Sequence, residues 1–239
     1  ESVSTERIAI YLQARPDRSI SIAERHLHVM DRMSAIPCPL GFHGLELPPV
    51  PDCGEELLAS YEIKTGLKGL SVIGTYAFRG PGYEYADVAA LDEIILYGFR
   101  SSNKAVDYPS VLRNGVASVA EAFGAYRVKV TYGMYSMDYQ DGVGREGPTL
   151  ADLKAAGVKD VDGRKNILTM YPAQFWDARL CSDALGFGPE EVFSRLEGKV
   201  DKVELTASGV YILLSDKVDL SYEEYLEFNR HAKALLGLQ

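Results

Sequence analysis

The clearest pattern of hydrophobic and polar positions lies between residues 200 and 236. Residues 203–206 alternate apolar with polar side chains, Ser208-Gly209 follows as a turn, and residues 210–214 form a β-branched and aromatic run. This pattern predicts a β-hairpin. Ser221 and Glu224 then have the spacing of a capping box, so we expect a helix from there to the region of Gly237. The C-terminal end is therefore predicted to be a strand–turn–strand–helix unit whose sheet and helix pack on each other.

The N-terminal half follows a related order. Ser21 and Glu24 again predict a helix start, and this helix should end before Pro37. We expect strands at residues 7–12, 70–78, 93–99 and 127–135, a short helix at 55–61, and a longer helix at 109–124. The main elements have the order β-α-β-β-α-β of a ferredoxin-like split unit.

The second half has a polar loop at 138–147, a short helix at 150–156 and a strand at 167–170, followed by helices at 174–185 and 190–196. With the hairpin and last helix this gives β-α-α-β-β-α. The sequence thus predicts an α+β fold with a mixed or antiparallel sheet and helices on one face. We interpret residues 1–239 as a single α+β domain, or alternatively as two intimately packed, fused ferredoxin-like halves, 1–145 and 146–239.

Composition restricts the classes of partner. The chain carries 25 Lys and Arg against 34 Asp and Glu, a formal net charge of −9, so direct nucleic-acid binding is disfavoured. Such a chain attracts a basic protein partner. The odd set Cys38, Cys53 and Cys181 favours free thiols in a reducing, cytoplasmic location. No apolar run reaches the ~20 residues of a membrane helix, so no membrane association is expected. A removed signal peptide before Glu1 remains the alternative for the location.

Motifs for chemistry are weak. Residues 142–147 match G-x-G-x-x-G, but Glu146 would set a negative charge beside phosphates and Pro148 removes a donor, so we favour a plain loop. His26 and His28 point to different sides of their helix, and no zinc-type spacing supports a metal site. We expect His26 to be a hydrogen-bonded core residue. The sequence predicts no catalytic residue, no metal and no cofactor.

Tyrosine interleaved with Asp and Glu is the most suggestive feature. Tyrosine supplies rigid contact area at low entropic cost, and carboxylates pair with Arg or Lys of a partner. Two segments show this pattern, and we predict that both bind a partner protein. Their residues are Tyr83, Glu84, Tyr85, Asp87, Tyr135, Asp138, Tyr139 and Asp141.

The chain resembles bacterial immunity proteins of the immunity protein 52 type and related type VI secretion immunity families. The likeness rests on Arg15-Pro16-Asp17-Arg18-Ser19-Ile20, Ala23-Glu24-Arg25, Phe123-Gly124-Ala125-Tyr126 before a Tyr-rich strand, and Gly209-Val210-Tyr211-Ile212-Leu213 before the last helix. The resemblance implies a cytoplasmic, non-catalytic α+β protein that binds a cognate toxin, a nuclease by expectation, and blocks its active-site groove. The alternative is an enzyme or small-molecule-binding protein with a pocket between two α+β halves.

Overall fold

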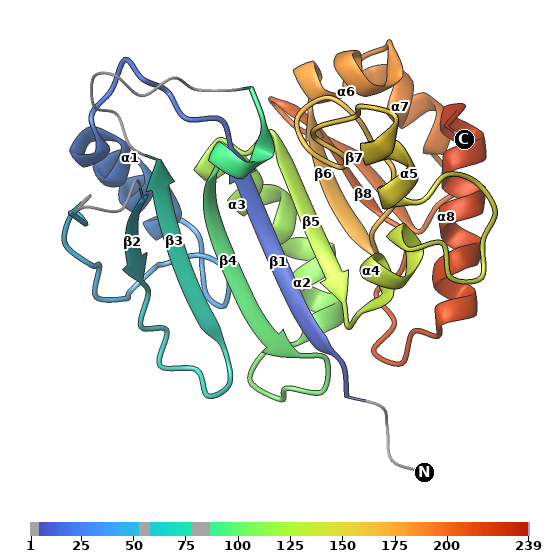
Figure 1. Cartoon of the computed structure of the whole chain (residues 1–239). Helices are drawn as coiled ribbons and strands as arrows, with labels where there is room; N and C mark the ends of the chain where they lie inside the picture. The colour runs from blue at the N-terminus through green and yellow to red at the C-terminus, as the bar shows by residue number, and fades with distance from the viewer. Residues whose placement is uncertain (1–4, 53–57, 78–86, 239) are drawn as a thin grey trace.

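The computed structural model describes residues 5–52, 58–77 and 87–238. Among them, eight strands form one antiparallel sheet in the order β2-β3-β4-β1-β5-β6-β8-β7 (Figure 1). This confirms the predicted α+β class. The strands are β1 (Arg7–Ala14), β2 (Leu58–Glu62), β3 (Ser71–Ala77), β4 (Glu93–Arg100), β5 (Arg127–Tyr132), β6 (Ala173–Asp177), β7 (Lys202–Leu205) and β8 (Gly209–Leu213).

The strand order relates the two halves of the chain. In the first half, β3-β4-β1-β5 is the strand order of a ferredoxin-like split unit, with β2 added at the edge. In the second half, β6, β7 and β8 take the order β6-β8-β7 and join the sheet through β5. Strand β5 therefore serves both halves, and the sheet continues without a break through the boundary at residues 145 and 146.

Helices cover both faces of the sheet, not one as expected. On β8, Tyr211 and Leu213 point into the core beneath α2 and α3, whereas Val210 and Ile212 point into a second core beneath α6, α7 and α8. The helices are α1 (Ile22–Ser34), α2 (Tyr108–Asn114), α3 (Val116–Phe123), α4 (Tyr135–Gln140), α5 (Leu150–Ala155), α6 (Ala178–Leu185), α7 (Pro189–Leu196) and α8 (Tyr222–Leu236), with a 3-10 turn η1 (Ala89–Leu91). None of the described helices is both long and apolar enough to cross a membrane.

The predicted helix starts are confirmed. Ser21 Oγ accepts a hydrogen bond from Glu24 N, and the Glu24 carboxylate accepts one from Ser21 N at 2.8 Å. Ser221 and Glu224 form the same reciprocal pair at α8, and Gly237 ends that helix in the left-handed conformation. These bonds satisfy backbone N–H groups that have no partner inside the helix.

Several predicted elements differ in the structure. Residues 167–170 form no strand, and the strand lies instead at β6, which overlaps the first residues of the helix predicted at 174–185. Residues 58–61 belong to strand β2, whereas a helix was expected at 55–61. Gly115 divides the predicted helix at 109–124 into α2 and α3. Pairing with β5 and β8 buries Phe175 and Trp176 on opposite faces of the sheet, which outweighs the local helical preference around β6.

The core contains His26, as predicted. Its Nδ1 lies 2.9 Å from the Tyr76 hydroxyl and its Nε2 lies 2.9 Å from the Pro48 carbonyl oxygen. The His26 ring also packs edge-on against Tyr61 and Tyr76, whose rings stack with centroids 5.1 Å apart. This aromatic cluster fastens the β2–β3 hairpin to α1.

Candidate partner-binding surface

The first predicted binding segment is described only at its end. Tyr83, Glu84 and Tyr85 lie outside the described residues. Asp87 contacts three cations of the second half: Arg164 at 3.2 Å, Lys165 at 2.8 Å and Arg179 at 3.4 Å. The hydrogen bond from Lys165, followed by that from Arg164, lowers the pKa of Asp87 to about 2. The Asp87 carboxylate thus joins the two halves, and its charge is already balanced within the protein.

The second predicted segment lies on a helix where a loop was expected, because α4 includes Tyr135, Asp138 and Tyr139. The Tyr135 hydroxyl donates a hydrogen bond of 2.9 Å to the Leu220 carbonyl, and its ring packs against Tyr225 of α8. Tyr139 is only 5% exposed and also packs against Tyr225. Both tyrosines therefore attach α4 to α8, and Tyr139 presents no large free surface.

The acidic residues of this segment remain accessible. Asp138 is partly exposed and Asp141 is exposed. They lie far from Asp87, because Asp87 precedes the start of β4 whereas α4 follows the end of β5, and these two strands run in the same direction. A strand of eight residues spans roughly 26 Å, so Asp87 and the second predicted segment lie at opposite ends of the sheet. The structure does not bring Asp87 together with Asp138 and Asp141.

A groove of about 630 Å³ separates α8 from the 144–146 segment, with Tyr139 at its base. Arg145 Cζ lies 4.4 Å from the centre of the Tyr139 ring, and Lys233 Nζ lies 3.3 Å from the Tyr139 hydroxyl. Burial, together with the positive charge of Arg145, lowers the pKa of Lys233. Glu223 and Glu227 also line the groove, so its charge is mixed.

On one half of the sheet, no described helix covers the front face. We call the side of β2, β3, β4 and β1 opposite α1, α2 and α3 the uncovered face. One cross-strand row on it runs Glu62, Ile73, Leu96, Tyr11, and the next runs Ser60, Thr75, Ile94, Gln13. Leu58 and Ile73 are each 46% exposed, and Ile94, Leu96 and Tyr11 are partly exposed.

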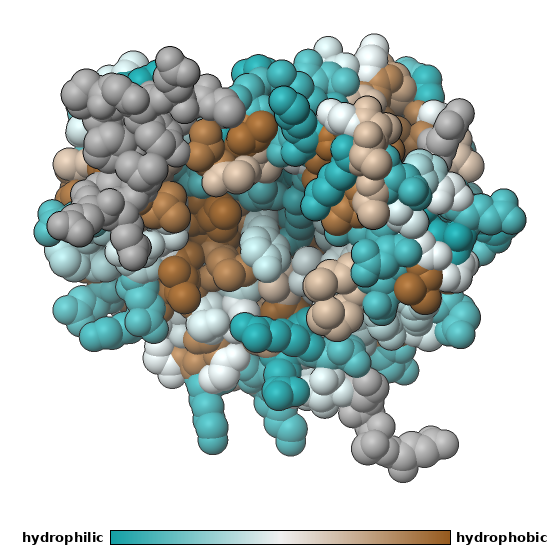
Figure 2. All heavy atoms as spheres, viewed as in Figure 1, coloured by the Kyte–Doolittle hydropathy of each residue, from teal (hydrophilic) through white to brown (hydrophobic). Residues whose placement is uncertain are grey.

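Figure 2 shows the result as an apolar area left of centre, over β3 and β4 in the orientation of Figure 1. Contiguous apolar area on the surface of a monomer marks an interaction site more often than isolated apolar side chains do. The uncovered face is therefore the best candidate for a partner-binding surface in the described part of the chain.

Residues 160–171 border the uncovered face and are held by buried ion pairs. The Arg127 guanidinium donates to the carbonyl oxygens of Gly163 and Asn166 at 2.9 and 2.8 Å, and contacts Asp162 at 3.2 Å. Burial by itself raises the pKa of Asp162, but the charges of Arg127 and Lys129 outweigh burial and leave that pKa lowered. This segment covers β5 and so fixes where the uncovered face ends.

Lys129 lies at that boundary, beside Tyr11 in the same cross-strand row. Burial, followed by the charge of Arg127, lowers the pKa of Lys129 to about 8. The Lys129 side chain is partly exposed, so this amino group with a lowered pKa lies at the edge of the uncovered face.

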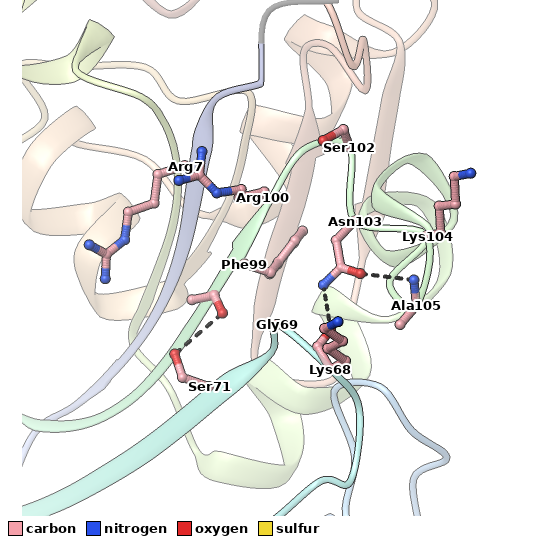
Figure 3. A pocket seen from close by; sticks show the side chains of 11 residues that line it. Arg7, Lys68, Gly69, Ser71, Phe99, Arg100, Ser102, Asn103, Lys104 and Ala105 are labelled. Carbon is pink, nitrogen blue, oxygen red and sulfur yellow. Dashed lines mark hydrogen bonds between the residues drawn. The ribbon is translucent and has the colours of Figure 1, made fainter.

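A pocket of about 610 Å³ lies at the other end of the uncovered face, where β1 and β4 meet the turns at residues 67–70 and 101–106 (Figure 3). Asn103 holds the two turns together: its Nδ2 donates to the Lys68 carbonyl at 3.1 Å, and its Oδ1 accepts from Ala105 N at 2.9 Å. The charged residues that line this pocket are Arg7, Lys68, Arg100 and Lys104, and no described acidic residue lines it.

The sequence contained one signal for the uncovered face that is easy to misread. Residues 94–97 are a continuous apolar run, which is typical of a strand buried on both faces. Ile95 and Tyr97 are indeed buried, whereas Ile94 and Leu96 face outward. A continuous apolar run can therefore also belong to a strand that no helix covers on one face.

Comparisons with protein families and with curated proteins find no match for this chain. Among solved structures, the fold is similar to that of a type VI secretion (T6SS) protein of Pseudomonas aeruginosa, PA0821, with a TM-score of 0.50 and 11% sequence identity. The match covers 96% of this chain and 76% of that protein. At this identity the likeness shows a similar fold and nothing more.

Proposed function

We propose that this protein is an immunity protein that binds and neutralises a cognate toxin of the type VI secretion kind, and that the uncovered sheet face is its main contact surface. The observation that carries the proposal is the apolar area formed by Leu58, Ile73, Ile94 and Leu96, which no described helix covers. The fold likeness to a T6SS protein and the resemblance of the sequence to immunity families supply the class of partner.

The mechanism we infer is occlusion. The toxin, expected to be a nuclease, has a basic substrate groove, and the net charge of −9 on this chain attracts such a surface from a distance. Apolar contacts on the uncovered face then hold the complex, since buried apolar and aromatic anchors contribute most of the binding energy at protein interfaces. No bond is made or broken by this chain in the proposal.

The test is a binding and rescue experiment with a candidate toxin chosen from the products of the neighbouring genes. Leu58→Lys and Ile73→Lys each place a charge on the proposed contact surface without opening a core cavity, because both side chains are already 46% exposed. We expect each variant to bind the toxin at least ~10-fold more weakly, a loss of about 1.4 kcal/mol, and to protect cells less well.

Matched controls use the same substitution elsewhere. Leu27, on α1, is 63% exposed, and Leu205, on the opposite edge strand β7, is 42% exposed. Leu27→Lys and Leu205→Lys should retain wild-type affinity. Equal affinity for all four variants would remove the uncovered face from the interface, and failure of the wild-type protein to bind or protect would remove the proposed function itself.

A further inference from the structure

The pocket at the end of the uncovered face contains an unusual pair of like charges. Arg7 of β1 and Arg100 of β4 are direct cross-strand neighbours. Residues directly opposite in an antiparallel pair have Cβ atoms about 4.5–5.5 Å apart, and like charges in that position repel. Figure 3 shows the two arginine side chains extending to the same side of the sheet.

Neither guanidinium group is neutralised within the part of the chain that the structure describes. Arg7 and Arg100 form no ion pair or side-chain hydrogen bond with any described residue. Several other arginines of this acidic protein are paired: Arg15, Arg25 and Arg113 each contact a carboxylate at 2.8 Å or less. An adjacent, uncompensated arginine pair in a chain of net charge −9 is therefore a specific feature rather than a consequence of composition.

The other residues of the pocket add positive charge and leave space for a ligand. Lys68 and Lys104 contribute two more ammonium groups on the turns that form the wall. Gly98 lies in the floor, where a Cβ atom would approach Ser71 Oγ to 2.8 Å, so the absence of a side chain keeps the backbone open. The volume of about 610 Å³ falls in the range of small-ligand sites.

We propose that this pocket binds a small ligand that carries a doubly charged phosphate group, with Arg7 and Arg100 as its primary contacts. Guanidinium groups match the oxygens of phosphate in bidentate geometry, and two of them side by side balance a charge of −2. A single carboxylate would leave half of that charge uncompensated. The proposal is independent of toxin binding, because it requires neither the apolar area nor a protein partner.

The test is titration calorimetry of the purified full chain with inorganic phosphate, pyrophosphate and citrate, in low-salt buffer. We expect pyrophosphate to bind most tightly and to raise the melting temperature, since a ligand that binds only the folded state stabilises it. Arg7→Gln and Arg100→Gln should each weaken pyrophosphate binding at least tenfold, and Lys104→Gln less, because Figure 3 shows Lys104 directed away from the arginine pair.

The control is Lys154→Gln, which removes an exposed positive charge on α5, outside the pocket. It should bind pyrophosphate as the wild type does. Loss of binding only in the pocket variants, with unchanged circular dichroism, supports the site. Absent binding, or binding unaffected by Arg7→Gln and Arg100→Gln, would overturn it.

Two further outcomes decide the class of ligand. Citrate binding equal to that of pyrophosphate would replace the phosphate assignment with a general polyanion site. A short single-stranded oligonucleotide that binds through the same arginines more tightly than pyrophosphate would show that the pocket holds a nucleic-acid backbone, and the small-ligand proposal would fail.

Discussion

Arg164 Nε donates a hydrogen bond of 2.7 Å to Asp92 Oδ1, and both side chains are buried. Asp92 precedes β4 in the first half of the chain, and Arg164 belongs to the segment that covers β5. Asp92 Oδ2 also accepts hydrogen bonds from Tyr126 and from Gln13. One carboxylate thus gathers donors from three segments at the border of the uncovered face.

Asp92→Asn should destabilise the protein strongly. The amide retains the shape of the side chain, but it leaves the buried Arg164 without its closest carboxylate. It also replaces one carboxylate oxygen with an NH2 group, which would face the donors that now bind Asp92. Removing one partner of a buried ion pair costs about 3–5 kcal/mol. Urea denaturation measures the loss.

Asp87→Asn is the control for this substitution, because Asp87 contacts the same Arg164 at 3.2 Å from a side chain that is 38% exposed. Solvent screening should limit its cost to less than about 1 kcal/mol. Equal losses for Asp87→Asn and Asp92→Asn would contradict a special role for the buried pair.

Gly74→Ala tests the close approach between β2 and β3. Tyr61 lies directly opposite Gly74, and a Cβ atom at residue 74 would lie 1.9 Å from Cζ of the Tyr61 ring. The ring would have to leave the aromatic cluster with His26 and Tyr76, at a cost of about 1–3 kcal/mol by comparison with other overpacked cores. Thermal denaturation measures the effect, and Gly98→Ala, whose Cβ would meet only the ends of the flexible Ser71 and Arg7 side chains, should cost less. An unchanged midpoint for Gly74→Ala would show that the cluster adapts freely.

Lys129 should give stability a distinctive pH dependence. Its pKa in the fold is about 8, because of burial and Arg127, whereas a lysine in an unfolded chain has a pKa near ~10.4. Between these two values the unfolded chain keeps a proton that the folded chain has lost, so this group adds stability as pH rises from 8 towards 10.

The measurement is the unfolding free energy of the wild type and of Lys129→Met at pH 7 and pH 9. The unfolding free energy of the wild type minus that of Lys129→Met should be larger at pH 9 than at pH 7, since all other groups are common to both proteins. Lys154→Met, at an exposed position on α5, is the control. A difference that is constant with pH would mean that Lys129 is not perturbed.

The acidic tyrosine segments make a separate prediction about the interface. If they contact the toxin as the sequence suggests, Asp138→Lys or Tyr85→Ala should weaken binding while leaving the melting temperature nearly unchanged, and affinity should fall as salt is raised. Calorimetry at two salt concentrations measures both effects. Wild-type affinity in Asp138→Lys together with reduced affinity in Ile73→Lys would assign binding to the uncovered face alone.

The sequence by itself determined the α+β class, the two capping boxes and the C-terminal hairpin and helix. These features are local. Ser221 and Glu224 are three residues apart, and the alternating residues 203–206 pair only with the strand that follows them in the sequence. It also identified His26 as a core residue, because that histidine falls on the apolar side of its helix.

The tertiary structure decided what depends on distant partners. Residues 173–177 form strand β6 because β5 and β8 pair with both of its edges. The local sequence alone favoured a helix there. Arg7 and Arg100 are 93 positions apart in the chain, yet strand register makes them neighbours. Which apolar residues remain outside depends on which helices fold over which part of the sheet. The uncovered face, unlike the core, could therefore not be read from the spacing of Ile73, Ile94 and Leu96.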